Sequence, residues 1–150
     1  MNDYQATKKE YPELVNIWSK SVKATHDFLK PSDFEQIKQE LPTYFSQVDV
    51  HIWMDQGKII GFSGVAEKKL EMLFLDPEFI GKGYGKRILA DLIAKSNIEY
   101  VDVNEQNKAA SDFYQAMGFN IFARSDQDEA GSISYFTFEK INRSSLKRMK

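Results

Sequence analysis

Cysteine is absent from this 150-residue chain. Without it the chain can form neither a disulfide framework nor a cysteine-rich zinc site, and it has no thiol nucleophile for covalent catalysis. Long apolar runs are also missing, and residues 1–5 show neither the basic nor the apolar part of a secretion signal. These absences lead us to expect a cytoplasmic protein that has no membrane partner.

An excess of positive charge is missing as well. The sequence holds 20 lysines and arginines against 22 aspartates and glutamates, a formal net charge of −2, which argues against nucleic acid as a partner of the whole chain. Hydrophobic residues make up 42% of the chain, enough for the core of one domain. We therefore expect a single domain over residues 1–140, followed by a basic, solvated C-terminal tail over residues 141–150.

Hydrophobic spacing and turn residues outline the secondary structure. Four helices are predicted. The first covers residues 11–23, and the second runs from a capping box at Ser32–Glu35 to Pro42. The third carries the apolar stripe Ile88–Ile93, and the fourth covers residues 108–117. Strands are predicted at 48–54, 58–66, 70–75, 98–103, 119–124 and 132–139, with an exposed acidic turn at 126–129. This order predicts an α/β protein whose mixed sheet is flanked by helices.

A glycine-rich segment, Gly81-Lys82-Gly83-Tyr84-Gly85-Lys86, separates the strand at 70–75 from the helix that follows. Glycines let the backbone approach an anion closely, and the unpaired N–H groups of the next helix point toward that anion. A nucleoside-triphosphate P-loop is excluded because Ile80 stands at its first glycine position and Arg87 at its hydroxyl position. A dinucleotide fingerprint is excluded because its third glycine position holds Lys86. A phosphorylated cofactor of another kind is expected.

A second motif follows the glycine-rich segment. From Asn107 the chain reads N-x-x-A-x-x-F-Y-x-x-x-G-F, which includes Ala110, Phe113-Tyr114 and Gly118-Phe119. The two motifs together resemble the signatures of the GNAT superfamily of N-acetyltransferases, over about residues 5–140. The resemblance implies a GNAT-like acyl-CoA N-acyltransferase fold, acetyl-CoA as cofactor, and direct transfer of the acetyl group to a primary amine in a ternary complex.

The resemblance also assigns residues to the cofactor. The pantetheine arm would add like a strand beside Leu73, Phe74 and Leu75, and a bulge in that strand would open the gap. Asn107 would steady the arm. The diphosphate would be held by the backbone of the loop, with charge from Lys82 or Lys86. The residues implied in this loop are Ile80, Gly81, Lys82, Gly83, Tyr84, Gly85 and Lys86; Ile80 departs from the family's Gln or Arg, which predicts somewhat weaker affinity.

Two residues are implied in the chemistry itself. Tyr114 matches the tyrosine that relatives place beside the leaving sulfur, where its hydroxyl would hydrogen-bond the developing thiolate; the alternative is an aromatic packed beside Phe113. Glu71 occupies a position where some relatives place a glutamate base. Its alternative is a surface carboxylate, and water or His26 could also take the proton. No metal ion enters this scheme.

The acceptor site is implied at the end of the first helix, where residues 21–29 resemble those of small bacterial YjaB-type members. His26 and Asp27 would bind or deprotonate the acceptor, although His26 could also be a polar loop residue. Asn104 is a further candidate, or a residue that merely leads into a helix. We expect the acceptor to be a small-molecule amine; a protein N-terminus or a lysine is the alternative acceptor. A CoA-binding sensor without catalytic activity is the alternative function. Both a monomer and a homodimer stay open.

Overall fold

The computed structural model describes residues 1–25, 30–125 and 135–140. Within these ranges the strands are β1 (Asn2–Gln5), β2 (Asp49–Asp55), β3 (Lys58–Ala66), β4 (Lys69–Leu75), β5 (Tyr100–Asn104), β6 (Phe119–Ser125) and β7 (Tyr135–Lys140). The helices are α1 (Tyr11–Thr25), α2 (Pro31–Phe45), α3 (Tyr84–Ser96) and α4 (Lys108–Ala116), with short 3-10 helices η1 (Lys8–Glu10) and η2 (Pro77–Phe79).

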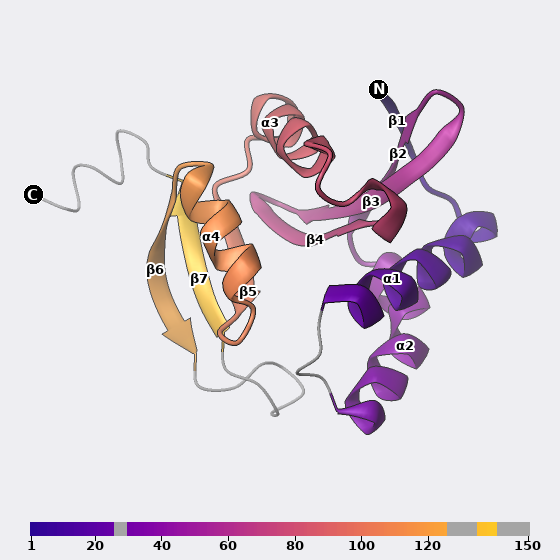
Figure 1. Ribbon diagram of the computed structural model, residues 1–150, viewed down its shortest axis with the longest axis horizontal. Coiled ribbons are helices and arrows are strands. Elements are labelled where there is room, and N and C mark those ends of the chain that lie inside the picture. Colours follow the sequence, from indigo (N-terminus) through magenta and orange to yellow (C-terminus); the bar gives the residue numbers. More distant parts are fainter. Residues whose placement is uncertain (26–29, 126–134, 141–150) are drawn as a thin grey trace, which may run out of the picture.

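All these strands form one sheet in the order β1-β2-β3-β4-β5-β7-β6. The neighbours β4 and β5 are parallel, whereas every other neighbouring pair is antiparallel. Figure 1 shows α1 and α2 beside the half of the sheet that contains β1–β4, and α4 along β5 and β7. The predicted mixed sheet flanked by helices is therefore confirmed.

The sheet opens between its two parallel strands. β4 pairs with β5 at two positions only among the described residues, Lys69 with Tyr100 and Leu70 with Val101. Beyond Leu70 no further β4–β5 pair occurs among the residues that the structure describes, so the sheet opens along Met72–Leu75. The opening lies in the middle of the sheet, where a strand would otherwise be covered on both edges.

A bulge in β4 coincides with the start of this opening. In the β3–β4 ladder Gly64 pairs with Met72 and Val65 pairs with Leu70, which leaves Glu71 as the extra residue. A bulge bends its strand and increases the local twist. The bend at Glu71 thus directs the second half of β4 away from β5, as the resemblance implied and the sequence alone could not locate.

Two hydrophobic cores hold the helices against the sheet. The α1–α2 core joins those helices to β2, β3 and β4 through Leu14, Ile17, Trp18, Val22, Leu41, Phe45, Val50, Ile52, Phe62 and Met72. The α3–α4 core joins the other two helices to the sheet through Trp53, Leu70, Ile88, Leu89, Leu92, Ile98, Val101, Val103, Tyr114, Phe119 and Phe138. No helix in the described ranges has the length and hydropathy needed to cross a membrane.

The predicted limits of α2 are wrong at both ends. The helix starts at Pro31 with Lys30 as its N-cap, so the expected capping box at Ser32–Glu35 lies inside it. Proline is favoured in the first helical turn because its fixed φ suits the helix. Pro42 does not end the helix, which continues to Phe45. Pro42 is exposed, and the buried Leu41 and Phe45 on either side of it hold the last turn against the core.

Other elements differ less from prediction. α1 continues to Thr25 rather than Lys23, and β5 begins at Tyr100 rather than Ile98. β1 was not predicted because Asn2–Gln5 is a polar, mostly exposed edge strand without the alternation that marks a buried one. The start of the last predicted strand, at 132–134, the acidic turn at 126–129 and the tail at 141–150 lie outside the described residues.

Candidate active site

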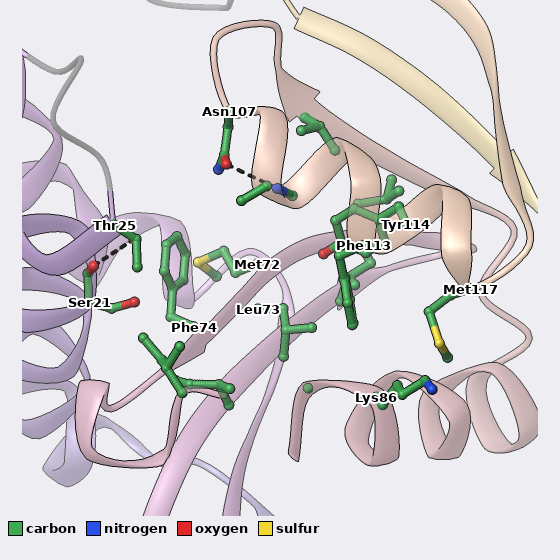
Figure 2. A pocket seen from close by; sticks show the side chains of 18 of the residues that line it. Ser21, Thr25, Met72, Leu73, Phe74, Lys86, Asn107, Phe113, Tyr114 and Met117 are labelled. Atoms are coloured by element: carbon green, nitrogen blue, oxygen red, sulfur yellow. Dashed lines mark hydrogen bonds between the residues drawn. The ribbon is translucent and has the colours of Figure 1, made fainter. Parts of the chain in front are cut away.

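The opening between β4 and β5 is a groove of about 670 Å³. Figure 2 shows its length, from Ser21 and Thr25 on α1 past β4 to Lys86 on α3, with α4 on the far side. The residues that line it come from α1, β4, the glycine-rich loop, β5 and α4. The predicted site residues among them are Glu71, Leu73, Phe74, Leu75, Ile80, Gly81, Gly83, Gly85, Lys86, Asn104, Asn107 and Tyr114.

One end of the groove is formed by the glycine-rich loop. Gly81 and Gly83 have φ values of +81° and +86°, a left-handed conformation that favours glycine, and a Cβ at either position would meet nothing within 4 Å. Gly83 is the N-cap of α3, so the unpaired N–H groups of that helix follow it directly. The loop therefore presents open backbone and the positive end of a helix dipole to the groove.

Three neighbouring predicted residues differ in their placement. The Lys86 side chain lines the groove and so does Ile80, which is exposed. Lys82 is not among the lining residues, and its Nζ lies 5.7 Å from the centre of the Phe79 ring. Of the two lysines expected near the phosphates, Lys86 has the better position.

Tyr84 has a structural partner outside the groove. Its hydroxyl donates a hydrogen bond of 2.7 Å to Asp55, and this bond raises the pKa of Tyr84 and lowers that of Asp55. The side chain is not among those that line the groove. The first residue of α3 is thus tied to the end of β2, which fixes the helix that follows the loop.

Asp76 anchors the start of the loop. Its side chain accepts a hydrogen bond from the N–H of Glu78 at 3.1 Å and forms an ion pair with Lys20 of α1 at 2.7 Å. Partial burial acts to raise the pKa of Asp76, but the bonds from Lys20 and Glu78 outweigh it, and the pKa is lowered. A charged carboxylate at this position therefore links α1 to the loop.

Strand β4 forms the floor of the groove. Leu73, Phe74 and Leu75 are half-buried and line it, and Met72 is buried beside them. Their backbone follows the last β4–β5 pair found in the described part of the chain, Leu70 with Val101. A ligand that enters the groove thus meets peptide groups as well as apolar side chains.

Tyr114 lies deep in the wall of the groove. It is 8% exposed and its ring packs against Phe113 and Phe119, with centroid distances of 5.1 and 5.9 Å. Figure 2 shows its hydroxyl on the side that faces β4. Burial strongly raises the pKa of Tyr114, so its hydroxyl keeps its proton over the neutral range.

Asn107 caps α4. Its side-chain oxygen accepts a hydrogen bond of 3.1 Å from the N–H of Ala110, which is the N-cap geometry of a helix start. The residue also lines the groove, as Figure 2 shows. In the structure, Asn107 begins the helix that carries Tyr114.

Glu71 sits at the bulge of β4, half-buried in the groove. Its Oε2 accepts a hydrogen bond of 2.9 Å from the hydroxyl of Tyr44 on α2. The Glu71 carboxylate is therefore held by the hydroxyl of Tyr44. Its place in the groove agrees with a role as catalytic base, which stays a prediction.

The acceptor end is described in part. His26 and Asp27 lie outside the described residues. Asn104 lines the groove, and its side-chain oxygen accepts a hydrogen bond of 2.8 Å from the N–H of Gln106, which turns the chain toward α4. Ser21 belongs to the segment 21–29 implied at the acceptor site, but it was given no role of its own. It is a groove residue that is 5% exposed, and Figure 2 shows its hydroxyl pointing toward the groove. Its place in that segment is the signal that could have singled it out.

A mixed sheet that opens between two parallel strands, with a glycine-rich loop at one end of the opening, is the arrangement that the resemblance to acyl-CoA-dependent acyltransferases implied. Comparison with protein families narrows this class. The chain belongs to the GNAT family of acetyltransferases: the family model described as "Acetyltransferase (GNAT) domain" matches residues 11–141.

Individual relatives support the assignment to the GNAT family. The peptidyl-lysine N-acetyltransferase YjaB of Salmonella typhimurium is 30% identical over 132 residues, which cover 87% of this chain and 91% of YjaB. The YjaB protein of Escherichia coli is 30% identical over 124 residues, 82% of this chain and 84% of YjaB. The solution structure of apo-form YjaB from Escherichia coli matches with a TM-score of 0.85 and 26% identity, covering 94% of this chain and 97% of that one.

These matches confirm several predictions made from the sequence. They are the resemblance to GNAT proteins and their YjaB-type members, the fold, the activity as an N-acetyltransferase, and acetyl-CoA as the cofactor. The roles of single residues are not decided by them and stay predictions.

Proposed function

We propose that this enzyme transfers the acetyl group of acetyl-CoA to the ε-amino group of a lysine in a polypeptide. The observation that carries this proposal is the match to relatives named peptidyl-lysine N-acetyltransferases along most of both chains. They favour the peptide acceptor, an alternative in the sequence analysis, over the small-molecule amine expected there.

Features of the groove fit acetyl-CoA as the donor. Its volume of about 670 Å³ lies in the range of ligand sites. Gly81 and Gly83 leave open space beside the backbone N–H groups that would hold the diphosphate, with Lys86 adding positive charge. The β4 backbone from Met72 to Leu75 would hydrogen-bond the pantetheine arm. The bound thioester supplies the acetyl group that the amine attacks.

Glu71 is proposed to remove the proton of the acceptor. A lysine amine has a pKa of about 10.4, so presenting it uncharged at pH 7 costs about 4.6 kcal/mol, at 1.36 kcal/mol per unit. A carboxylate at the groove, directly or through one ordered water, can accept that proton as the amine attacks. The Glu71 carboxylate is held in place by Tyr44 and reaches the groove from the bulge.

Tyr114 is proposed to act on the leaving side. Because burial raises its pKa, the hydroxyl is a hydrogen-bond donor and not a ready acid. An ordinary thiol, with a pKa of about 8.5, is already a stronger acid than this phenol, so complete proton transfer to the thiolate would be uphill. A hydrogen bond that strengthens as charge develops on sulfur is the step that this side chain can perform.

A thiol-release screen tests the acceptor. Acetyl-CoA is supplied with three matched acceptors: a peptide with a blocked N-terminus and one lysine, the same peptide with a free N-terminus and an acetylated lysine, and a panel of small primary amines. We expect free CoA and acetylated product with the first peptide. Turnover with the second or third acceptor instead would reject the lysine assignment. Acetyl-CoA binding without turnover on any acceptor would identify a sensor.

A further inference from the structure

We propose that Tyr44 is a positioning residue for Glu71. Its hydroxyl holds one carboxylate oxygen so that the other oxygen faces the groove. The inference rests on the proposed function, because it assumes that Glu71 receives a proton there. It assigns to α2, a helix that carries none of the predicted site residues, a part in the reaction.

The backbone at Glu71 explains why a positioning residue is needed. Glu71 is the bulged residue, set between the Gly64–Met72 and Val65–Leu70 pairs of the ladder. A residue in regular pairing has its direction set by the pleat, whereas a bulged residue is released from that alternation. The direction of the Glu71 side chain therefore depends on what it contacts beyond the strand.

Tyr44 is itself well placed to supply that contact. It lies in the last turn of α2, beside the fully buried Phe45, and is partly buried against the α1–α2 core. This turn exists because α2 continues past Pro42. The hydroxyl of Tyr44 donates to Oε2 of Glu71 at 2.9 Å, within the range of O–H···O hydrogen bonds.

Glu71 also occupies a junction. A second cavity, of about 660 Å³, is lined by residues that include Asp49, Glu67 and Tyr100. Among the described residues Glu71 alone lines both this cavity and the groove. A carboxylate held at this junction can take a proton from the groove side and exchange it with water on the other side. With Oε2 engaged by Tyr44, Oε1 is the oxygen that serves the groove.

A double-mutant cycle tests the inference with the variants Tyr44→Phe, Glu71→Gln and the combination of both. If Tyr44 acts through Glu71, Tyr44→Phe lowers kcat about five- to twenty-fold in the wild type and has no further effect in Glu71→Gln. Acetyl-CoA affinity, measured by calorimetry, and the KM of the peptide stay unchanged. A merely structural role would instead lower the melting temperature and disturb binding.

Tyr4→Phe is the matched control. It removes the hydroxyl of an exposed tyrosine on the edge strand β1, away from the groove. Its kcat should equal that of the wild type. Equal proportional losses from Tyr44→Phe in both backgrounds, or none in the wild type, would overturn the inference and leave the proposed function standing. Failure of the wild type to acetylate lysine peptides would reject the proposed function, and the inference with it.

Discussion

At the scale of single residues, Tyr114 has the surroundings that most restrict its chemistry. Its phenol is enclosed by Phe113 and Phe119 while its hydroxyl remains at the groove. Burial raises the pKa of the hydroxyl by disfavouring the phenolate. The same environment thus keeps the side chain neutral and leaves it able to donate one hydrogen bond.

Tyr114→Phe tests the catalytic role. The substitution keeps the packed ring and removes only an interaction that strengthens as the thiolate develops, so the loss belongs in kcat. We expect a decrease of roughly ten- to a hundred-fold, or about 1.4 to 2.7 kcal/mol, with nearly constant acetyl-CoA affinity. The measurements are kcat at saturating acetyl-CoA, the dissociation constant and the melting temperature. Normal turnover in a well-folded variant would rule the role out.

The wild type and Tyr114→Phe should also differ in how their stability depends on pH. The folded pKa of Tyr114 is raised above the value of about 10 in the unfolded chain, so its contribution to stability is complete below pH 10. As pH rises further, the unfolded chain ionises first and stability falls by up to about 1.4 kcal/mol per unit. Urea unfolding at pH 9 and pH 11 should show a larger loss for the wild type than for Tyr114→Phe. Equal losses would contradict the burial.

Which residues the sequence could identify follows from their distance along the chain. Tyr114 and Asn107 belong to one continuous motif, so their common location was predictable. Ser21 lies in the segment implied at the acceptor site, but its own part could not be predicted, because it reaches the groove only when α1 packs against β4. Glu71 could be proposed as a base from its place on a strand, but its bulge and its bond to Tyr44, 27 residues away, depend on the folded sheet.

At the scale of elements, the glycine-rich loop combines two properties. Its glycines adopt left-handed conformations at Gly81 and Gly83, and the space beside them is open. The loop ends at the first turn of α3. An anion could approach the backbone at these glycines without meeting a side chain. A side chain at either position would hinder that approach.

Gly83→Glu tests this loop, with Gly57→Glu as its control. Both glycines have positive φ values, +86° and +76°, and open space beside them, so each substitution costs about 1 to 2 kcal/mol of backbone strain. Each also adds one negative charge. Gly83→Glu should weaken acetyl-CoA binding at least about a hundred-fold by bulk and repulsion, whereas Gly57→Glu, in the β2–β3 turn, should bind normally in calorimetry. Equal affinities would remove the loop from the site.

Elements were predictable where the local pattern agreed with the packing. β3 was predicted with its observed bounds, Lys58–Ala66, because turn residues precede it and its pattern is strongly apolar. α2 was not, since the buried Leu41 and Phe45 outweigh the helix-ending tendency of Pro42. β1 carries almost no hydrophobic signal and exists because β2 offers it an edge.

At the scale of the whole molecule, one ion pair connects the helical layer to the loop of the groove. Lys20 on α1 bonds Asp76, which follows β4 and caps η2. The chain between them spans α2, β2, β3 and β4, so the contact joins parts that are distant in sequence. It holds the end of β4 against α1.

Asp76→Asn measures that connection. Asparagine is also a good N-cap, so the variant should lose mainly the charge interaction with Lys20, about 0.5 to 1 kcal/mol at pH 7. Because the pKa of Asp76 is lowered in the folded protein, its stabilisation is present above the unfolded value of about 3.9 and is lost as pH falls below it. The stability difference between the two proteins should be constant from pH 7 to about pH 5 and should shrink as pH falls below about 3.9. A difference that does not shrink there would assign the effect to packing.

The opening between β4 and β5 also makes the amount of folded enzyme depend on its donor. The two halves of the sheet share only two paired positions among the described residues, and a ligand lying along Met72–Leu75 would bridge them in the native state alone. By mass action, each tenfold rise of acetyl-CoA above its dissociation constant then adds about 1.4 kcal/mol to the free energy of unfolding. Thermal melts over a series of acetyl-CoA concentrations would measure this slope. When the donor runs short, turnover stops and the polypeptide itself becomes easier for proteases to remove.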